Sequence, residues 1–134
     1  MKIHATVSRK QNYAKADRQY RQQADNIISR AGLLVMNEAK RSIQLSLGGG
    51  RTYGNHTASA AGQPPNTDTG FLVSNIYLKK DNDGLGCDVE SRADYSIHLE
   101  FGTRKMQARP FMQPALESQK AKIKKLFRRL KARL

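Results

Sequence analysis

The chain has 134 residues, enough for one domain with a modest core. It has no Trp and few other aromatic residues, so large stacking surfaces are scarce, and its formal net charge of +13 favours an acidic partner, either nucleic acid or an acidic protein face. No stretch approaches the length of a transmembrane helix, and the N-terminus lacks the apolar run of a signal peptide. We therefore expect a soluble protein made in a cytoplasm.

Two elements are predicted before residue 48. Ile3, Ala5 and Val7 alternate with polar residues, which predicts a short strand with one buried face. From residue 17 to residue 47, apolar residues recur at helical spacing and predict a long amphipathic helix. We expect the three glycines at 48–50 to end this helix and to supply its C-cap.

Residues 48–68 are predicted to form one extended loop. They include five glycines and the pair Pro64 and Pro65, with little that could be buried. A loop of this length inside a small domain is uncommon and is usually functional or disordered when alone. We interpret it as an arm that becomes ordered against a neighbouring molecule.

Alternating apolar residues in 74–80 and 85–91 predict two strands. Residues 81–84, Asp-Asn-Asp-Gly, predict a hairpin turn between them, because Asp and Gly tolerate a positive φ. Residues 69–73 fit a capped turn or a short helix. Residues 95–101 fit either a third strand or a short helix, and we favour the helix.

The last predicted element is a helix over residues 111–133. Pro114 fits its first turn, where a missing N–H costs no hydrogen bond. Apolar residues form one stripe along it, and residues 118–134 hold eight Lys and Arg but no Asp or Glu. The predicted fold class is α+β, with two long amphipathic helices packed on a small antiparallel β-sheet. We expect one domain over residues 1–134, with the loop at 48–68 and the basic C-terminal helix at 111–134.

Three blocks in a fixed order carry the most specific pattern in the chain. They are Ser59-Ala-Ala-Gly-Gln-Pro-Pro65, running into Asp68-Thr-Gly-Phe-Leu72 and Ser74-Asn-Ile76; Tyr95-Ser-Ile-His-Leu-Glu-Phe-Gly-Thr103; and Ala108-Arg-Pro-Phe-Met-Gln-Pro-Ala-Leu116. Together they resemble the type 1 neck proteins of tailed bacteriophages, also known as head–tail joining, minor tail or tail completion proteins. The chain departs from that family at Asn75, which separates Ser74 from Ile76, and at Phe71, where a basic or polar residue is more usual.

The resemblance implies a structural virion protein and not an enzyme. Such proteins form a homo-oligomeric ring between head and tail, expected here to be sixfold or twelvefold, with DNA passing through the lumen. The implied partners are head-closure or adaptor proteins and tail-terminator or tail-tube proteins. The protein would be made in the host bacterial cytoplasm and located in the virion, at the neck or tail.

The motif blocks also supply the residues expected at subunit or partner contacts. We expect Glu100 to be exposed and to form a salt bridge or an amide contact between subunits, and we expect Phe101 to lie in the core. Phe111 and Met112 are expected to pack at the start of the last helix. The full interface set is Pro64, Pro65, Thr69, Gly70, Tyr95, Glu100, Phe101, Gly102, Thr103, Arg104, Arg109, Pro110 and Phe111, with Arg104, Lys105 and Arg109 available to pair with Glu100.

Neither a catalytic set, nor a cofactor site, nor a metal site is predicted. His4, His56 and His98 are far apart in sequence and lack the spacing of metal ligands. Cys87 is the only cysteine, which excludes an internal disulfide, and its place in an alternating pattern predicts a small buried hydrophobe.

Two other functions stay open. The last helix could be a solvated face, could dock on an acidic protein, or could contact DNA phosphates, which would make the chain a basic, sequence-independent nucleic-acid-binding protein. An enzyme such as a nuclease would draw on Asp94, His98 and Glu100, although no second acidic cluster is available to hold a metal. The residues of the basic helix are Lys120, Lys124, Lys125, Arg128, Arg129 and Lys131.

Overall fold

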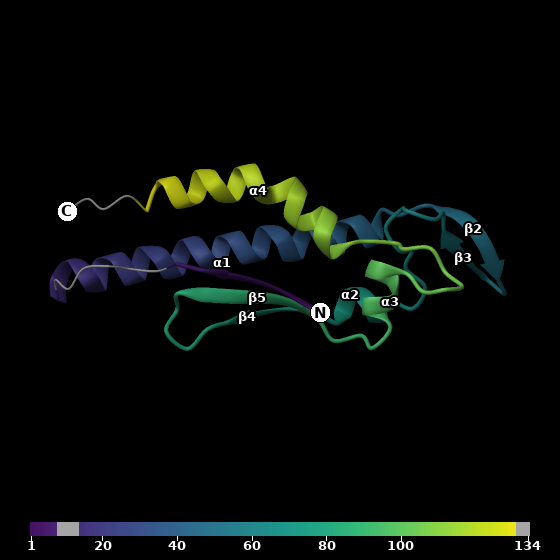
Figure 1. Ribbon diagram of the computed structural model, residues 1–134, viewed down its shortest axis with the longest axis horizontal. Helices are drawn as coiled ribbons and strands as arrows, with labels where there is room; N and C mark the ends of the chain where they lie inside the picture. Colours follow the sequence, from purple (N-terminus) through teal and green to yellow (C-terminus); the bar gives the residue numbers. More distant parts are fainter. Residues whose placement is uncertain (8–13, 131–134) are drawn as a thin grey trace.

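A computed structural model describes residues 1–7 and 14–130 of the chain (Figure 1). The protein is an α+β fold, as the sequence predicts, but within these ranges it has two small antiparallel sheets and one long helix instead of one sheet and two long helices. The sequence predicts that the last helix reaches residue 133, but it ends at Arg128 and residues 129–130 form a turn, while Lys131 and the rest of that prediction lie outside the described residues. The elements in chain order are β1 (Lys2–Thr6), α1 (Ala14–Gln44), β2 (Gly48–Tyr53), β3 (His56–Ser59), α2 (Phe71–Ser74), β4 (Ile76–Lys80), β5 (Gly86–Ser91), α3 (Ser96–Phe101) and α4 (Met112–Arg128).

The larger sheet has three antiparallel strands in the order β1-β5-β4. Val89 in the central strand lies opposite Ile3 on one side and Leu78 on the other, so the apolar residues share one face of the sheet. The predicted hairpin turn joins β4 to β5, and Gly84 adopts a φ of 70° that favours glycine there. The predicted strands at 3–7, 74–80 and 85–91 are confirmed.

Helix α1 runs along the length of the molecule between the sheet and α4 (Figure 1). Its buried residues recur every three or four positions, which places them on one face. Gly32 lies where the helix meets the sheet, since a Cβ there would overlap the side chain of Leu78 and approach Cys87 Sγ at 2.9 Å. Cys87 is buried, as predicted. The buried hydrophobic side chains of α1 in the described ranges are Ala24, Ile28, Ala31, Val35, Ala39 and Ile43.

Helix α4 packs along α1 and closes the core. Met112 and Ala115 join the same hydrophobic cluster as Ile76 and Val89 of the sheet. Pro114 stands in the first turn of α4, as predicted, where no intrahelical hydrogen bond is lost. No helix in the described ranges, 1–7 and 14–130, is both long and apolar enough to cross a membrane.

The prediction of one loop over 48–68 is wrong, because β2 and β3 form an antiparallel hairpin inside it. Gly54 and Asn55 make the turn, with Gly54 at a φ of 58°. A Cβ on Gly50 would overlap the carbonyl oxygen of Ser59, so this glycine permits the close approach of the two strands. The glycines at 48–50 therefore belong to a strand, and α1 ends before them, at Gln44.

The two short predicted helices are present as α2 and α3. The alternative of a third strand at residues 95–101 is wrong. Gly102 ends α3 at a φ of 74°. A Cβ at this position would lie 2.9 Å from backbone atoms of Met106 and Ala108, which is too close for a side chain. This glycine directs the chain into the turn that leads to α4.

Candidate partner-binding site

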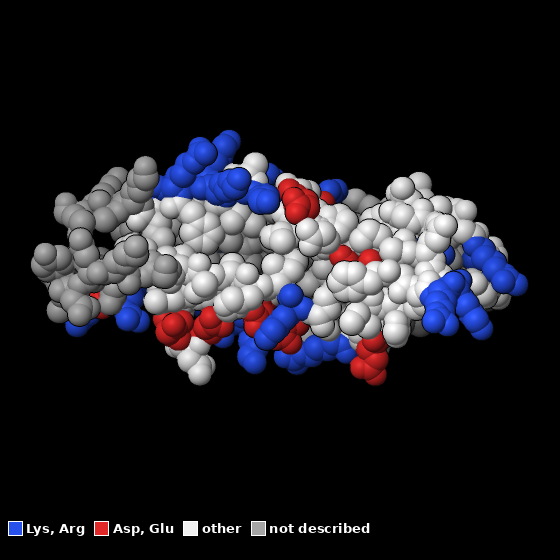
Figure 2. All heavy atoms as spheres, in the orientation of Figure 1, with Lys and Arg blue, Asp and Glu red and all other residues white. Residues whose placement is uncertain are grey.

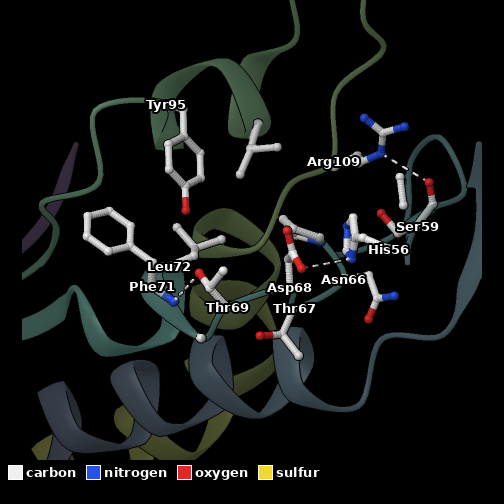
Figure 3. Close-up of a pocket in the computed structure, with 14 residues that line it drawn as sticks. His56, Ser59, Asn66, Thr67, Asp68, Thr69, Phe71, Leu72, Tyr95 and Arg109 are labelled. Atoms are coloured by element: carbon white, nitrogen blue, oxygen red, sulfur yellow. Dashed lines mark hydrogen bonds and ion pairs between the residues drawn. The ribbon is translucent and has the colours of Figure 1, made fainter. Parts of the chain in front are cut away.

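The motif blocks meet around one pocket of about 370 Å³ near the hairpin (Figure 3). Five of the predicted interface residues line it: Pro65, Thr69, Gly70, Tyr95 and Arg109. They come from the segment before α2, from the start of α3 and from the segment before α4. The structure thus brings together residues that are up to 44 positions apart in the sequence.

Hydrogen bonds to backbone carbonyl groups hold the walls of this pocket in place. Arg109 donates its N–H to the carbonyl oxygen of Leu99 at 2.6 Å and its Nε–H to that of Ser59 at 3.2 Å. Gly62 donates its N–H to the carbonyl oxygen of Ala108 at 2.9 Å. Arg109 therefore ties the hairpin to α3 within one molecule, and this role was not foreseen from the sequence.

Phe71 and Tyr95 form an exposed aromatic pair on one wall of the pocket, with ring centroids 6.2 Å apart (Figure 3). Gly70 adopts a φ of 79° at the start of α2, and Thr69 Oγ1 accepts a hydrogen bond from the N–H of Phe71 at 3.3 Å. Partial burial, and then the charge of Asp68, raise the pKa of the Tyr95 hydroxyl. The pair presents apolar area to solvent from a locally fixed backbone.

The prediction for Phe101 is wrong, because its side chain is 73% exposed. Ser96 and Glu100 form the buried face of α3, one helical turn apart. Phe101 follows Glu100 by about 100° around the helix axis and so points away from that face, beside the exposed Ile97. We call Phe71, Tyr95, Ile97 and Phe101 the apolar surface of α2 and α3.

The prediction for Glu100 is also wrong, because this side chain is only 6% exposed. Its carboxylate accepts hydrogen bonds from the backbone N–H groups of Phe111 at 2.9 Å, Met112 at 3.0 Å and Gln113 at 2.8 Å. These are free N–H groups at the start of α4, and a negative charge is favourable there. Glu100 therefore caps α4 within its own chain, instead of pairing with Arg104, Lys105 or Arg109.

Phe111 is 0% exposed, in agreement with its predicted packing role, and Met112 is buried beside it. We call Glu100, Phe111 and Met112 the α3–α4 junction. The turn after α3 leaves Thr103 and Arg104 exposed, and Thr103 donates its N–H to the carbonyl oxygen of Met106 at 2.8 Å. These two residues stay available to a partner.

Pro64 and Pro110 do not line the main pocket. Pro64 lies in a separate groove beside the end of α1, where its carbonyl oxygen accepts a hydrogen bond from Ser46 Oγ at 2.7 Å. Pro110 is half-buried between Arg109 and the junction. The predicted interface set therefore divides into pocket residues, exposed residues and residues that hold the fold.

The pocket also contains polar groups that sequence reasoning did not select. His56 Nδ1 lies 3.8 Å from Asp68 Oδ1 (Figure 3). Ser59 is buried, and its hydroxyl has no hydrogen-bond partner among the described residues. The sequence held one signal for this grouping, namely the two residues Gly54-Asn55 between two β-prone runs, which is typical of a hairpin.

A second polar cluster lies on the three-stranded sheet, where the sequence predicts no metal site. His4 is paired with Asp88 across the strands, its Nδ1 is hydrogen-bonded to Asp88 Oδ1, and its Nε2 lies 3.7 Å from Asp81 Oδ2. These three residues could offer ligand atoms to a metal. However, Lys2 Nζ lies 3.3 Å from Asp88 Oδ2 and already supplies a positive charge.

The charge state of Asp88 follows from these contacts. Burial by itself raises the pKa of its carboxyl group, but hydrogen bonds from His4 and Lys2 outweigh that effect and hold the pKa below its usual range. On the far side of β5, burial and then the charges of Asp88 and Asp81 raise the pKa of the Cys87 thiol. The cluster thus acts as a local network of charges on the sheet.

The basic residues of α4 gather on its solvent side (Figure 2). These five residues and Arg129, which follows the helix, are exposed, and in the part of the chain that the structure describes none of the six forms an ion pair. We call Lys120, Lys122, Lys124, Lys125, Arg128 and Arg129 the basic face.

The chain matches no protein-family model, no curated protein and no solved structure.

Proposed function

We propose that this protein is a structural component of a phage neck that assembles with copies of itself into a ring between head and tail. The observation that carries the proposal is the apolar surface of α2 and α3, where four large apolar side chains are exposed on segments that bear the motifs. Exposed apolar groups gathered in one region mark interaction sites on soluble proteins. The phage context comes from the motif resemblance alone.

The contrast between buried and exposed residues within one motif block supports an assembly role. Glu100 has both carboxylate oxygens engaged by backbone N–H groups, which removes the central acid from a nuclease arrangement with Asp94 and His98. Phe101, the next residue, is instead presented to solvent. A segment that fixes one side chain inward and its neighbour outward suits a rigid docking surface.

A ring requires a head-to-tail contact, in which one patch of a subunit meets a different patch of the next. Leu99 of α3 lines the pocket and stands about 200° around the helix from Phe101, so the pocket and Phe101 face different sides of α3, which is compatible with such a contact. The β2–β3 hairpin extends from the same end of the molecule (Figure 1) and is a candidate for reaching the neighbouring subunit or the next ring. Head-closure and tail-tube proteins would meet the two open faces of the ring, and DNA would pass through its lumen.

The experiment is native mass spectrometry with negative-stain imaging of the purified protein, alone and in virions. We expect closed rings, and we expect the double substitution Phe71→Ser with Phe101→Ser to give folded subunits that no longer assemble. Leu33→Ser is the matched control, because Leu33 is also exposed but lies on α1. A ring that survives the double substitution, or a virion that lacks the protein, would overturn the proposal.

A further inference from the structure

The basic face occupies one side of α4 over its last three turns. At 100° per residue, Lys120, Lys124 and Arg128 form one row, and Lys125 and Arg129 form a second row beside it. The opposite side carries the half-buried and buried apolar residues Ile123, Leu126, Phe127 and Leu130. The helix therefore packs on the protein through its apolar side and exposes its cations to solvent.

Within the described ranges no acidic side chain forms an ion pair with this face. Most acidic side chains are engaged elsewhere, for example Asp25 with Lys80 and Glu38 with Arg41. Glu117 is the one acidic residue of α4, and its carboxylate accepts a hydrogen bond from Gln113 at the other end of the helix. The pKa of Glu38 is lowered mainly by its hydrogen bond from Arg41, with a smaller contribution from the charge of Lys122. Lys122 therefore interacts weakly with this acid.

The composition of the face favours a polyanion over an acidic protein. Protein interfaces are depleted in Lys and enriched in aromatic residues at their centres, whereas this face has four Lys, two Arg and Ala121 between them. Phe127 lies on the apolar side of the helix, so the basic face itself offers no aromatic ring to stack on bases. Contacts with phosphates alone would be independent of sequence.

The size of the face also fits a duplex. The nine helical residues 120–128 extend about 13 Å along the axis, and double-stranded DNA carries about one charge per 1.7 Å, so about eight phosphate charges lie along that length. We propose that the basic face of α4 binds the phosphate backbone of double-stranded DNA without sequence preference. This inference does not rest on ring assembly.

The test is the salt dependence of binding by the full chain to a labelled 20-bp duplex, followed by fluorescence anisotropy. We expect the logarithm of the association constant to fall against the logarithm of salt concentration with a slope of about −4 to −5, since about five phosphates are neutralised. The triple variant Lys120→Gln, Lys124→Gln, Arg128→Gln should reduce that slope by about 2.7 and weaken binding at least about tenfold at 0.1 M salt.

The control is the triple variant Arg18→Gln, Arg30→Gln, Lys79→Gln, which removes the same charge from exposed positions outside α4 and outside the predicted interface set. Its slope should equal that of the unchanged protein. Equal losses in both triple variants would reduce the effect to net charge and overturn the proposal, as would an absence of binding at 0.05 M salt.

Two further arms identify the partner class and separate this proposal from ring assembly. Polyglutamate should compete far less well than a duplex of equal charge, and equal competition would favour an acidic protein instead. The Phe71→Ser, Phe101→Ser variant should bind the duplex with the same slope as the unchanged protein. Loss of binding in that variant would tie DNA contact to assembly and contradict an independent basic face.

Discussion

Phe101 and Phe111 lie in adjacent motif blocks, yet the first is 73% exposed and the second is 0% exposed. Phe111 belongs to the α3–α4 junction, where Glu100 caps the helix and Met112 fills the core. Phe101 belongs to the apolar surface of α2 and α3. The comparison teaches that neighbouring motif blocks can serve two purposes, with some residues holding the fold and others left exposed for a partner.

The largest expected effect separates these two regions directly. Phe111→Ala should lower the free energy of unfolding by about 3–5 kcal/mol, because it leaves a cavity in a core that admits no solvent. Phe101→Ala should change it by less than about 0.5 kcal/mol, because that side chain is already in water. Urea denaturation followed by circular dichroism measures both, and equal losses would contradict the comparison.

Glu100→Ala should give the next largest effect, a loss of about 2–3 kcal/mol, because three backbone N–H groups at the start of α4 lose a charged acceptor. Glu117→Ala is the control, since Glu117 is exposed on the same helix and accepts a hydrogen bond from the exposed Gln113 side chain. Hydrogen exchange should show faster exchange of the Phe111–Gln113 amides. If Glu100→Ala were as stable as the control, Glu100 would not stabilise the start of α4, and its predicted role at a partner contact would be favoured.

Gly50→Ala tests whether the β2–β3 hairpin, at the proposed assembly end of the molecule, needs the close approach of its two strands at Gly50. A Cβ at this position would overlap the carbonyl oxygen of Ser59, which should cost about 1–3 kcal/mol and disorder the β2–β3 pairing. Gly49→Ala is a close control, because its nearest atom would be Ala60 Cβ at 3.6 Å, an ordinary contact. Amide exchange in the hairpin measures the difference, and identical protection in the two variants would argue against the close approach.

The smallest expected effect lies on the three-stranded sheet, in neither region. Because contacts with His4 and Lys2 lower the folded pKa of Asp88, its contribution to stability is present above the unfolded pKa and is lost as the pH falls through the folded pKa. Stability should therefore fall as the pH drops below about 4. Asp88→Asn should lessen this dependence in urea denaturation at pH 6 and pH 3, without changing assembly. An unchanged pH dependence would show that other carboxylates dominate.

Local patterns predicted the elements whose structure depends on nearby residues. The apolar spacing from Ala24 to Ile43 defines α1, the Asp-Asn-Asp-Gly turn defines the β4–β5 hairpin, and the run of cations defines the basic face. Periodicity and turn chemistry act over a few residues, so they can be read without knowing the fold. The burial of Phe111 and Cys87 followed from the same patterns.

Tertiary structure alone decided the roles of the residues between those elements. Glu100 is buried because the start of α4 arrives beside α3 and needs an acceptor, and Phe101 is exposed because it stands about 100° around the helix from that contact. The pairing of His4 with Asp88 joins residues 84 positions apart. Such contacts depend on how distant segments pack, and the residue types that make them are compatible with either a surface or a buried place until that packing is known.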